Sequence, residues 1–185
     1  MTVSHPPAPP WPVALVGHMG SGKTAVGGRL AQRLHLPFVD SDTEVERAAG
    51  MAIPEIFAVH GEAAFRDCER RVIQRLLGEG PAVIATGGGA FAQDATRAVL
   101  LDGALTLWLR AGLDTLVRRT QRRQDRPLLQ NTDHRDKLAA LQAERDPLYA
   151  LAHGLVPTDD GPLDATVTAA VEAVARHCPA RETPS

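Results

Sequence analysis

The residues with the clearest chemical potential lie near the start of the chain, where residues 17–24 read Gly-His-Met-Gly-Ser-Gly-Lys-Thr. This is the spacing G-x-x-x-x-G-K-[ST], in which backbone N–H groups surround phosphates, the lysine reaches the outer phosphates and the hydroxyl binds Mg²⁺. An apolar run precedes the loop and a helical pattern follows it, so the loop opens a helix whose first turn attracts anions. We therefore predict a nucleoside triphosphate site rather than a glycine-rich turn without a ligand. Its residues are Gly20, Ser21, Gly22, Lys23, Thr24 and Ala25.

Two aspartates follow the next apolar run, in the sequence Asp40-Ser41-Asp42. One carboxylate beside the phosphate loop could hold Mg²⁺ through water, because this ion keeps much of its hydration. The other could hydrogen-bond an acceptor hydroxyl and take its proton during transfer. Capping of the following helix is the competing explanation, and Ser41 or Asp42 could serve that purpose as well.

Three consecutive glycines, Gly87, Gly88 and Gly89, come directly after another apolar run. Because they carry no side chains, a ligand can lie on the backbone, whose N–H groups can bind an anion or a hydroxyl. A flexible turn without chemical consequence is the alternative. The position at a strand end favours a ligand site.

Several arginines could be more than surface charges. Arg66 and Arg145 each lie in a helical pattern, and a guanidinium grips a carboxylate with two hydrogen bonds. If both converge on one pocket, the acceptor is an anion.

The arginine-rich segment from Arg118 to Arg126 lacks interleaved aromatic residues. We interpret it as a lid that closes over the nucleotide, in preference to a solvated loop or a nucleic-acid patch.

The histidines and cysteines of the chain do not indicate a metal site or a reactive nucleophile. His18 occupies a variable position of the phosphate loop, and we expect it to be exposed and not catalytic. The remaining histidines form no spaced ligand set, so no zinc site is expected. Cys68 and Cys178 are far apart in the sequence and are interpreted as reduced and structurally incidental.

Composition limits the class of protein. The chain has 185 residues, of which 44% are hydrophobic, and a formal net charge of −2. This suits one domain with a real core and gives no general attraction to nucleic acid or to anionic membranes. There is no apolar stretch of membrane-spanning length, and the proline-rich start does not have the form of a secretory signal. We therefore expect a cytoplasmic protein, and a monomer.

Apolar runs alternate with helical patterns along the chain. Strands are expected at 13–16, 37–39, 82–86, 105–109 and 154–156, and helices at 24–34, 43–49, 54–77, 92–101, 113–122, 134–150 and 163–176. Alternation of this kind predicts an α/β fold with a parallel, five-stranded sheet covered on both faces, in three layers. The ligand crevice of such a sheet lies beyond the carboxyl ends of its strands. We expect a lead-in over 1–11, a single domain over 12–178 with a lid at about 119–133, and a flexible tail over 179–185.

Taken together, these motifs resemble the shikimate kinase family, from about residue 12 to residue 176. The resemblance rests on the phosphate loop with Met19, on Phe38-Val39-Asp40-Ser41-Asp42, Phe65-Arg66 with Glu69, Thr86-Gly87-Gly88-Gly89, Arg126-Pro127-Leu128-Leu129, and Glu144-Arg145 followed by Pro147-Leu148-Tyr149. It implies a P-loop kinase fold, like that of the nucleoside monophosphate kinases, with strand order 2-3-1-4-5. It also implies transfer of the γ-phosphoryl group of ATP to the 3-hydroxyl of shikimate in chorismate and aromatic amino acid biosynthesis.

The resemblance also implies roles for individual residues. Asp42 would bind shikimate hydroxyls and be the candidate base, Arg66 and Arg145 would hold the shikimate carboxylate, and the Gly88 backbone would bind a ring hydroxyl. Lys23 and Arg126 would neutralise the transferring phosphate, and Arg119 would be a second lid arginine facing the nucleotide. One Mg²⁺ ion would be held by Thr24 directly and by Asp40 through water. Phe57 and Phe65 would wall the acceptor pocket, and Glu69 would orient Arg66.

Two other functions stay open at this point. A gluconate kinase-like enzyme of the same fold would also use arginines for an acid, although the triple glycine and the Glu-Arg-x-Pro-Leu-Tyr run favour shikimate. A non-catalytic nucleotide-binding module should lack Lys23, Asp42 or a lid arginine, and the chain has all of them. The sequence departs from many members of the family at Ala25, where they have a hydroxyl residue. Thr24 keeps the hydroxyl that the metal needs.

Overall fold

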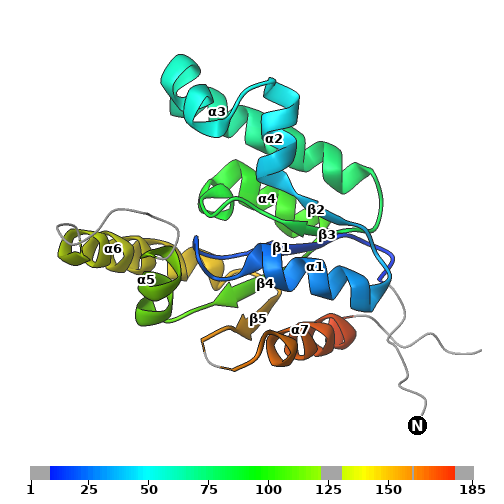
Figure 1. Ribbon diagram of the computed structural model, residues 1–185. Coiled ribbons are helices and arrows are strands. Elements are labelled where there is room, and N and C mark those ends of the chain that lie inside the picture. Colours follow the sequence, from blue (N-terminus) through cyan, green and yellow to red (C-terminus); the bar gives the residue numbers. More distant parts are fainter. Residues whose placement is uncertain (1–8, 122–130, 160, 178–185) are drawn as a thin grey trace, which may run out of the picture.

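A parallel five-stranded sheet in the order β2-β3-β1-β4-β5 forms the centre of the computed structural model, which describes residues 9–121, 131–159 and 161–177 (Figure 1). Each of its four strand pairings is parallel. The predicted sheet and strand order are confirmed, and each strand begins and ends within one residue of its expected bounds. The strands are β1 (Val13–Val16), β2 (Phe38–Asp40), β3 (Val83–Ala85), β4 (Leu105–Arg110) and β5 (Gly154–Pro157).

Helices follow each strand. They are α1 (Lys23–Leu34), α2 (Ser41–Ala49), α3 (Ile53–Gly78), α4 (Asp94–Gly103), α5 (Leu113–Gln121), α6 (Asn131–Tyr149) and α7 (Leu163–His177), with a short 3₁₀ helix η1 (Ala90–Ala92) before α4. α4 begins two residues later and α6 three residues earlier than expected, and two further differences have a local cause. α2 begins at Ser41, because Asp40 Oδ1 accepts a hydrogen bond from the Asp42 N–H and so caps the helix. α3 is interrupted at Gly61, which has non-helical backbone angles and marks a kink.

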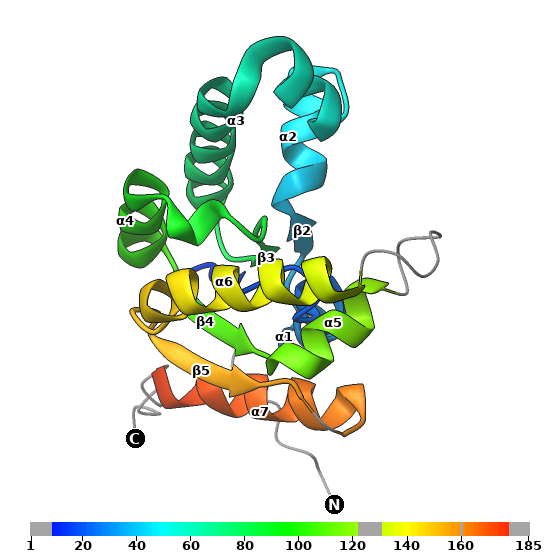
Figure 2. The same ribbon diagram turned by 90° about the vertical axis from the view of Figure 1, so that its left-hand side faces the viewer.

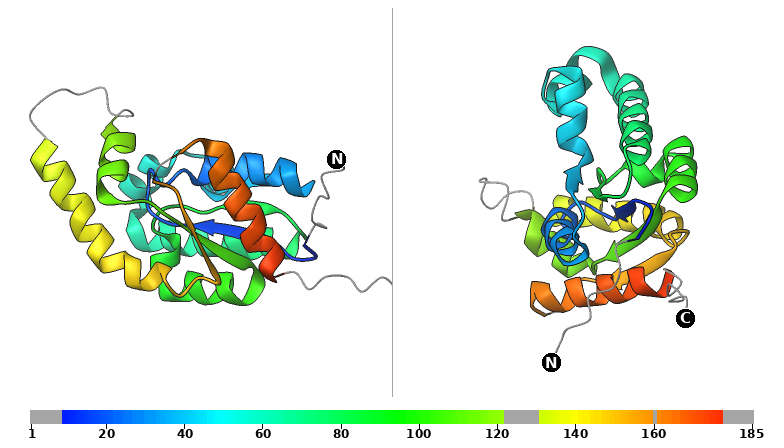
Figure 3. Two further views of the ribbon diagram at one scale, coloured as in Figure 1. Left: turned by 90° about the horizontal axis from the view of Figure 1, so that it is seen from below. Right: turned by 90° about the vertical axis from the view of Figure 1, so that its right-hand side faces the viewer.

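The helices form a layer on each face of the sheet. Side chains of α1 and α7 pack on one face, in a core that includes Leu15, Leu30 and Val174. Side chains of α3, α4 and α6 pack on the other face, around Phe91 and Tyr149. The views in Figure 3 show these layers, with α5 and α6 side by side at one end of the molecule. Because both faces are covered, all four residues of β1 are fully buried, which explains why they are uniformly apolar.

α2 and the first part of α3 form an arm that rises beyond the sheet (Figure 2). A separate apolar cluster, including Val45, Ile56, Phe65 and Val72, joins the two helices to each other and to Ile84 of β3. This packing fixes the orientation of α3, and therefore of the side chains that α3 directs toward the ends of the strands.

The strand register brings three loops to the same edge of the sheet. Asp40 at the end of β2 pairs with Ala85 of β3, which in turn pairs with Leu15 of β1. The loops that leave these strands therefore begin side by side. The Thr86 hydroxyl joins two of them by donating to the Leu15 carbonyl at 3.0 Å. In the described ranges, no helix is both long enough and apolar enough to cross a bilayer.

Candidate active site

The phosphate loop connects β1 to α1. Gly22, directly before α1, has a φ of 96°, in the left-handed region that glycine adopts without a steric penalty. The Lys23 ammonium donates to the carbonyls of Gly17 at 2.7 Å and His18 at 2.8 Å, which holds the lysine over its own loop. With the first turn of α1 behind it, the loop presents backbone N–H groups, a helix N-terminus and a cation to one point, which is the arrangement that binds phosphates.

A pair of oxygen ligands lies beside this loop. The Thr24 hydroxyl, on the first turn of α1, donates to Asp40 Oδ2 at 3.1 Å. The other carboxylate oxygen of Asp40 caps α2, so the side chain is held from two sides. A hydroxyl and a carboxylate at this distance are hard oxygen donors of the kind that Mg²⁺ takes. The residues present therefore fit the ion predicted from the sequence.

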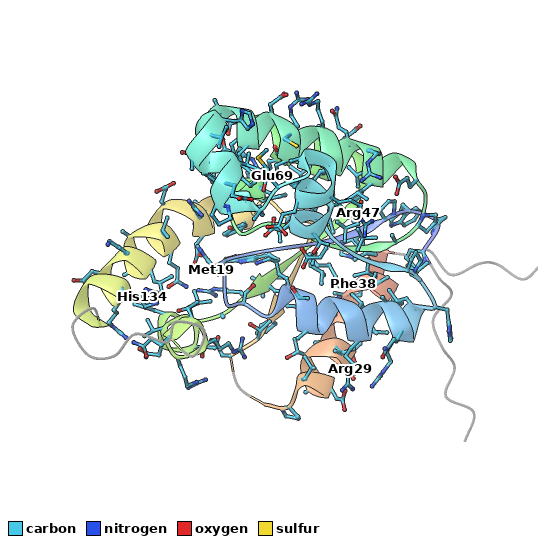
Figure 4. The ribbon with its side chains drawn as sticks, turned by 45° about the horizontal axis from the view of Figure 1, so that its top comes forward. Met19, Arg29, Phe38, Arg47, Glu69 and His134 are labelled. Atoms are coloured by element: carbon cyan, nitrogen blue, oxygen red, sulfur yellow. The ribbon has the colours of Figure 1, made fainter. Side chains whose placement is uncertain are left out.

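The triple glycine makes three close approaches that a side chain would prevent. A Cβ atom at Gly87 would lie 2.6 Å from Asp42 Oδ1, and one at Gly89 would lie 2.8 Å from Arg66 Nη2. A Cβ atom at Gly88 would lie 3.1 Å from the backbone nitrogen of Met19, in the phosphate loop. Figure 4 shows Met19 between α6 and the arm of α2 and α3. The glycine loop is thus in contact with both the phosphate loop and the predicted acceptor residues.

The ion pair between Arg66 and Glu69 forms one side of the site. Arg66 Nη1 donates to Glu69 Oε2 at 2.8 Å. Glu69 is 1% exposed, and burial raises the pKa of its carboxyl group although the hydrogen bond from Arg66 opposes this. Within the described part of the chain, the other carboxylate oxygen of Glu69 is buried and has no hydrogen-bond partner. The predicted contact between Glu69 and Arg66 is present in the structure.

Asp42, the second residue of α2, lies near this pair, since a Cβ atom at Gly87 would be close to both Asp42 Oδ1 and Glu69 Oε1. Burial raises the pKa of the Asp42 carboxyl group, and the negative charge of Asp40 adds to the effect. Lys23 and Arg66 act in the other direction. A carboxylate that is partly withdrawn from water, beside cations, is well suited to accept a proton from a bound hydroxyl.

The last turn of α6 contacts the glycine loop through two side chains. Arg145 Nη1 donates to the Gly88 carbonyl at 3.4 Å, and the Tyr149 hydroxyl donates to the same oxygen. Burial raises the pKa of Tyr149 to about 12, which keeps the hydroxyl protonated as a donor. The structure therefore brings Arg66, Arg145 and Asp42 into the neighbourhood of the triple glycine.

Arg119 of α5 lies beside the phosphate loop. Its Nη2 atom donates to the Thr158 carbonyl at 2.6 Å, in the segment after β5, and its Nη1 atom is 3.5 Å from the Gly20 carbonyl in the phosphate loop. The guanidinium thus connects the phosphate loop to the end of the sheet. Arg126 and most of the predicted lid lie outside the described residues.

Phe57 and Phe65, the two residues expected to line the acceptor pocket, are in contact, with ring centroids 4.5 Å apart.

One prediction about the site was wrong. His18 is only 5% exposed, whereas the sequence suggested an exposed side chain. Its Nε2 atom is 2.8 Å from Asp146 Oδ1, and its ring meets Tyr149 edge-on at 4.9 Å. Asp146 and Tyr149 were missed as partners, because they are more than 120 residues away in the sequence and the phosphate-loop motif leaves position 18 open. The only feature of the sequence that could have drawn attention to Asp146 and Tyr149 is that they lie close to Arg145.

A parallel sheet in this strand order, with a phosphate loop after its central strand, defines a P-loop kinase. The family model of the shikimate kinases matches residues 19–175. The chain is 51% identical to the shikimate kinase of Bradyrhizobium diazoefficiens over 165 residues, which are 89% of this chain and 80% of that protein. The chain therefore belongs to the shikimate kinase family.

Solved structures agree with this assignment. The shikimate kinase of Acinetobacter baumannii, in complex with shikimate, superimposes with a TM-score of 0.83 at 36% identity, over 93% of this chain and 97% of that one. A gluconokinase of Sinorhizobium meliloti superimposes with a TM-score of 0.59 at 19% identity, over 91% of this chain and 93% of that one. The second likeness shows a shared fold only.

Proposed function

We propose that this enzyme transfers the γ-phosphoryl group of ATP to the 3-hydroxyl of shikimate. The observation that carries the proposal is the convergence of Arg66, Arg145, Asp42 and the triple glycine beside a phosphate loop, in a member of the shikimate kinase family. Shikimate is a small carboxylate with neighbouring hydroxyl groups. Its recognition needs cations for the carboxylate and oxygen or backbone groups for the hydroxyls, and the site offers both.

The acceptor residues have separate roles in this proposal. Arg66 and Arg145 bind the carboxylate from two sides, and Glu69 holds Arg66 in position through the 2.8 Å hydrogen bond. Gly87, Gly88 and Gly89 let the ring lie close to the backbone, where an N–H group binds a ring hydroxyl. Phe57 and Phe65 form an apolar wall beside the ring. Asp42 receives hydrogen bonds from the hydroxyl groups.

ATP occupies the phosphate loop in this proposal. The backbone of Gly20, Ser21, Gly22 and Ala25 surrounds the phosphates, Lys23 neutralises their charge, and Arg119 and Arg126 face the nucleotide from the lid side. Thr24 and Asp40 hold one Mg²⁺ ion, with Asp40 acting through water. The ion neutralises charge on the β- and γ-phosphates when it is bound.

In the transfer step, the oxygen of the acceptor hydroxyl attacks the γ-phosphorus. The bond between this phosphorus and the β–γ bridging oxygen breaks, and ADP leaves. The proton of the hydroxyl passes to Asp42 and then to solvent, while Lys23 and Arg126 stabilise the charge on the transferring group. We place this reaction in chorismate and aromatic amino acid biosynthesis, in the cytoplasm, and propose a monomeric enzyme.

A direct test measures ADP release with Mg·ATP and shikimate, gluconate or no acceptor. We expect strong stimulation by shikimate alone. Stimulation by gluconate instead would keep the fold and overturn the acceptor. No stimulation by either compound, with ATP still bound in an equilibrium titration, would point to another acceptor or to a non-catalytic nucleotide-binding module.

A further inference from the structure

The phosphate loop is connected to the last turn of α6 by a partly buried hydrogen bond between side chains. His18 Nε2 lies 2.8 Å from Asp146 Oδ1, and the exposed fractions of the two side chains are 6% and 24%. A carboxylate can only accept, so the imidazole carries its proton on Nε2 and donates it to Asp146. Burial lowers the pKa of His18, although Asp146 opposes the shift. The lowered pKa favours the neutral imidazole, whose single N–H donor is then on Nε2.

The helix turn that receives this hydrogen bond also carries two groups of the acceptor site. Arg145 precedes Asp146, and both Arg145 and Tyr149 donate to the carbonyl of Gly88. The ring of His18 meets that of Tyr149 edge-on, with centroids 4.9 Å apart. His18 is therefore in contact with the segment that places Arg145, although it lies in the nucleotide loop.

The third member of this junction is the triple-glycine loop. A Cβ atom at Gly88 would be 3.1 Å from the backbone nitrogen of Met19, the residue after His18. The phosphate loop, the glycine loop and the last turn of α6 thus meet around His18. A shift of α6 relative to the phosphate loop would displace Arg145 from Gly88, and phosphoryl transfer is sensitive to such displacements because it depends on alignment.

We propose that His18 and Asp146 are positioning residues, which hold the carboxylate-binding arginine of α6 in register with the phosphate loop. This inference rests on the proposed function, because it assigns the acceptor carboxylate to Arg145. Neither residue touches a substrate in this assignment. Their hydrogen bond sets the distance between the two halves of the site, so its loss should affect the acceptor more than the nucleotide.

The test compares His18→Leu with His18→Gln. Leucine fills the space without a donor, whereas the glutamine amide nitrogen can take the place of Nε2 and donate to Asp146. We expect His18→Leu to raise the KM of shikimate about tenfold, the scale of one charge-assisted hydrogen bond, and to leave the KM of Mg·ATP within about twofold. His18→Gln should restore most of the shikimate affinity.

A double-mutant cycle with Asp146→Ala distinguishes the pair from two independent sites. We expect the double variant His18→Leu/Asp146→Ala to be no worse than the poorer single variant, because both remove the same interaction. Asp136→Ala, which removes an exposed acid elsewhere on α6, is the matched control and should behave like the parent.

Several outcomes would overturn the inference. These are an unchanged shikimate KM in His18→Leu, equal changes in the KM values of both substrates, failure of His18→Gln to restore binding, or full additivity in the cycle. Melting curves and ATP titrations for each variant identify any that do not fold. If the parent enzyme itself does not turn over shikimate, the proposed function fails instead, and the two failures are thereby separated.

Discussion

Asp42 is the residue whose surroundings best fit proton transfer. Its carboxyl group has a raised pKa because of burial, with Asp40 adding to the effect, and it faces the triple glycine at close range. We expect Asp42→Asn to lower kcat by about 10² to 10⁴-fold, the range for loss of a general base, while the Kd of Mg·ATP stays near that of the parent. Steady-state kinetics and calorimetric titration would measure the two quantities.

The exposed neighbour Thr43 supplies the control for this substitution, since Thr43→Ala removes a side chain of the same turn without touching the acceptor residues. It should leave kcat unchanged. Turnover by Asp42→Asn close to that of the parent would remove Asp42 as the base and leave it a role in positioning the hydroxyl only.

The lowered pKa of His18 also predicts how the stability of the protein depends on pH. Its pKa in the folded protein is below the ordinary value of 6.5, so the unfolded chain takes up a proton that the folded chain does not. The contribution of His18 to the free energy of unfolding is therefore fully present above pH 6.5. It is lost as the pH falls toward the folded-state pKa, by at most about 1.4 kcal/mol per pH unit for one proton. The groups that face the ring are Asp146, Arg145 and Tyr149 from α6, and Lys23 from α1.

Urea denaturation of the parent and of His18→Gln, at several pH values between 7.5 and 5, would measure this effect. We expect the free energy of unfolding of the parent to fall more steeply with acidification than that of the variant. Parallel pH dependences would show that His18 does not titrate differently in the folded and unfolded chains.

At the scale of single elements, α1 contains two adjacent glycines in different surroundings. A Cβ atom at Gly27 would lie 2.6 Å from the ring of Phe38, whose position beside α1 is seen in Figure 4, whereas a Cβ atom at Gly28 would have no atom within 4 Å. We expect Gly28→Ala to stabilise the protein by about 0.5–1 kcal/mol, because alanine is the better helix former. Gly27→Ala should instead destabilise it by about 1–3 kcal/mol through overpacking.

The two variants control each other, since both make the same chemical change in the same helix. Urea denaturation and steady-state kinetics should show the opposite signs in stability, with the turnover of Gly28→Ala unchanged. Equal effects of the two substitutions on stability would mean that helix propensity, and not the contact with Phe38, decides the result.

The elements themselves were predictable because their signals are local. A short apolar run before a phosphate-loop motif indicates a buried strand and a helix start, and this was sufficient for β1 and α1. The start of α2 was harder. Asp40 had been assigned to the metal, yet its carboxylate also caps the helix, and a single side chain with two functions cannot be recognised from its type alone.

The pairing of His18 with Asp146 could not be predicted for a different reason. It depends on how α6 crosses the end of the sheet, which is a property of packing over 128 residues of separation. The converging acceptor residues are also distant in sequence. Their positions at strand ends and their residue types marked Asp42, the triple glycine, Arg66 and Arg145 as candidates, but the family resemblance was needed to assign them to one acceptor site.

The stability of the whole molecule should respond to each ligand separately. A ligand at one hundred times its Kd stabilises the folded state by about 2.7 kcal/mol, which is several degrees in melting temperature for a chain of this size. We expect both shikimate and Mg·ATP to raise the melting temperature of the parent. Arg66→Ala should lose the response to shikimate and keep the response to Mg·ATP.

Arg71→Ala is the control for this experiment, because Arg71 is an exposed arginine on the same helix. It should keep both responses. Loss of the Mg·ATP response in Arg66→Ala would contradict a role confined to the acceptor carboxylate.

The two tryptophans of the chain lie toward opposite ends of two neighbouring strands, Trp11 before the start of β1 and Trp108 in the second half of β4. Trp108 pairs with Val16 at the end of β1, its ring is 6.0 Å from that of Tyr149, and it lies against the phosphate loop at Gly17. Trp11 lies at the opposite end of β1 from the phosphate loop and lines a cavity with His153 and His177. The molecule therefore contains an intrinsic fluorophore next to the nucleotide loop and the last turn of α6. Its second indole, that of Trp11, lies outside this junction, at the other end of β1.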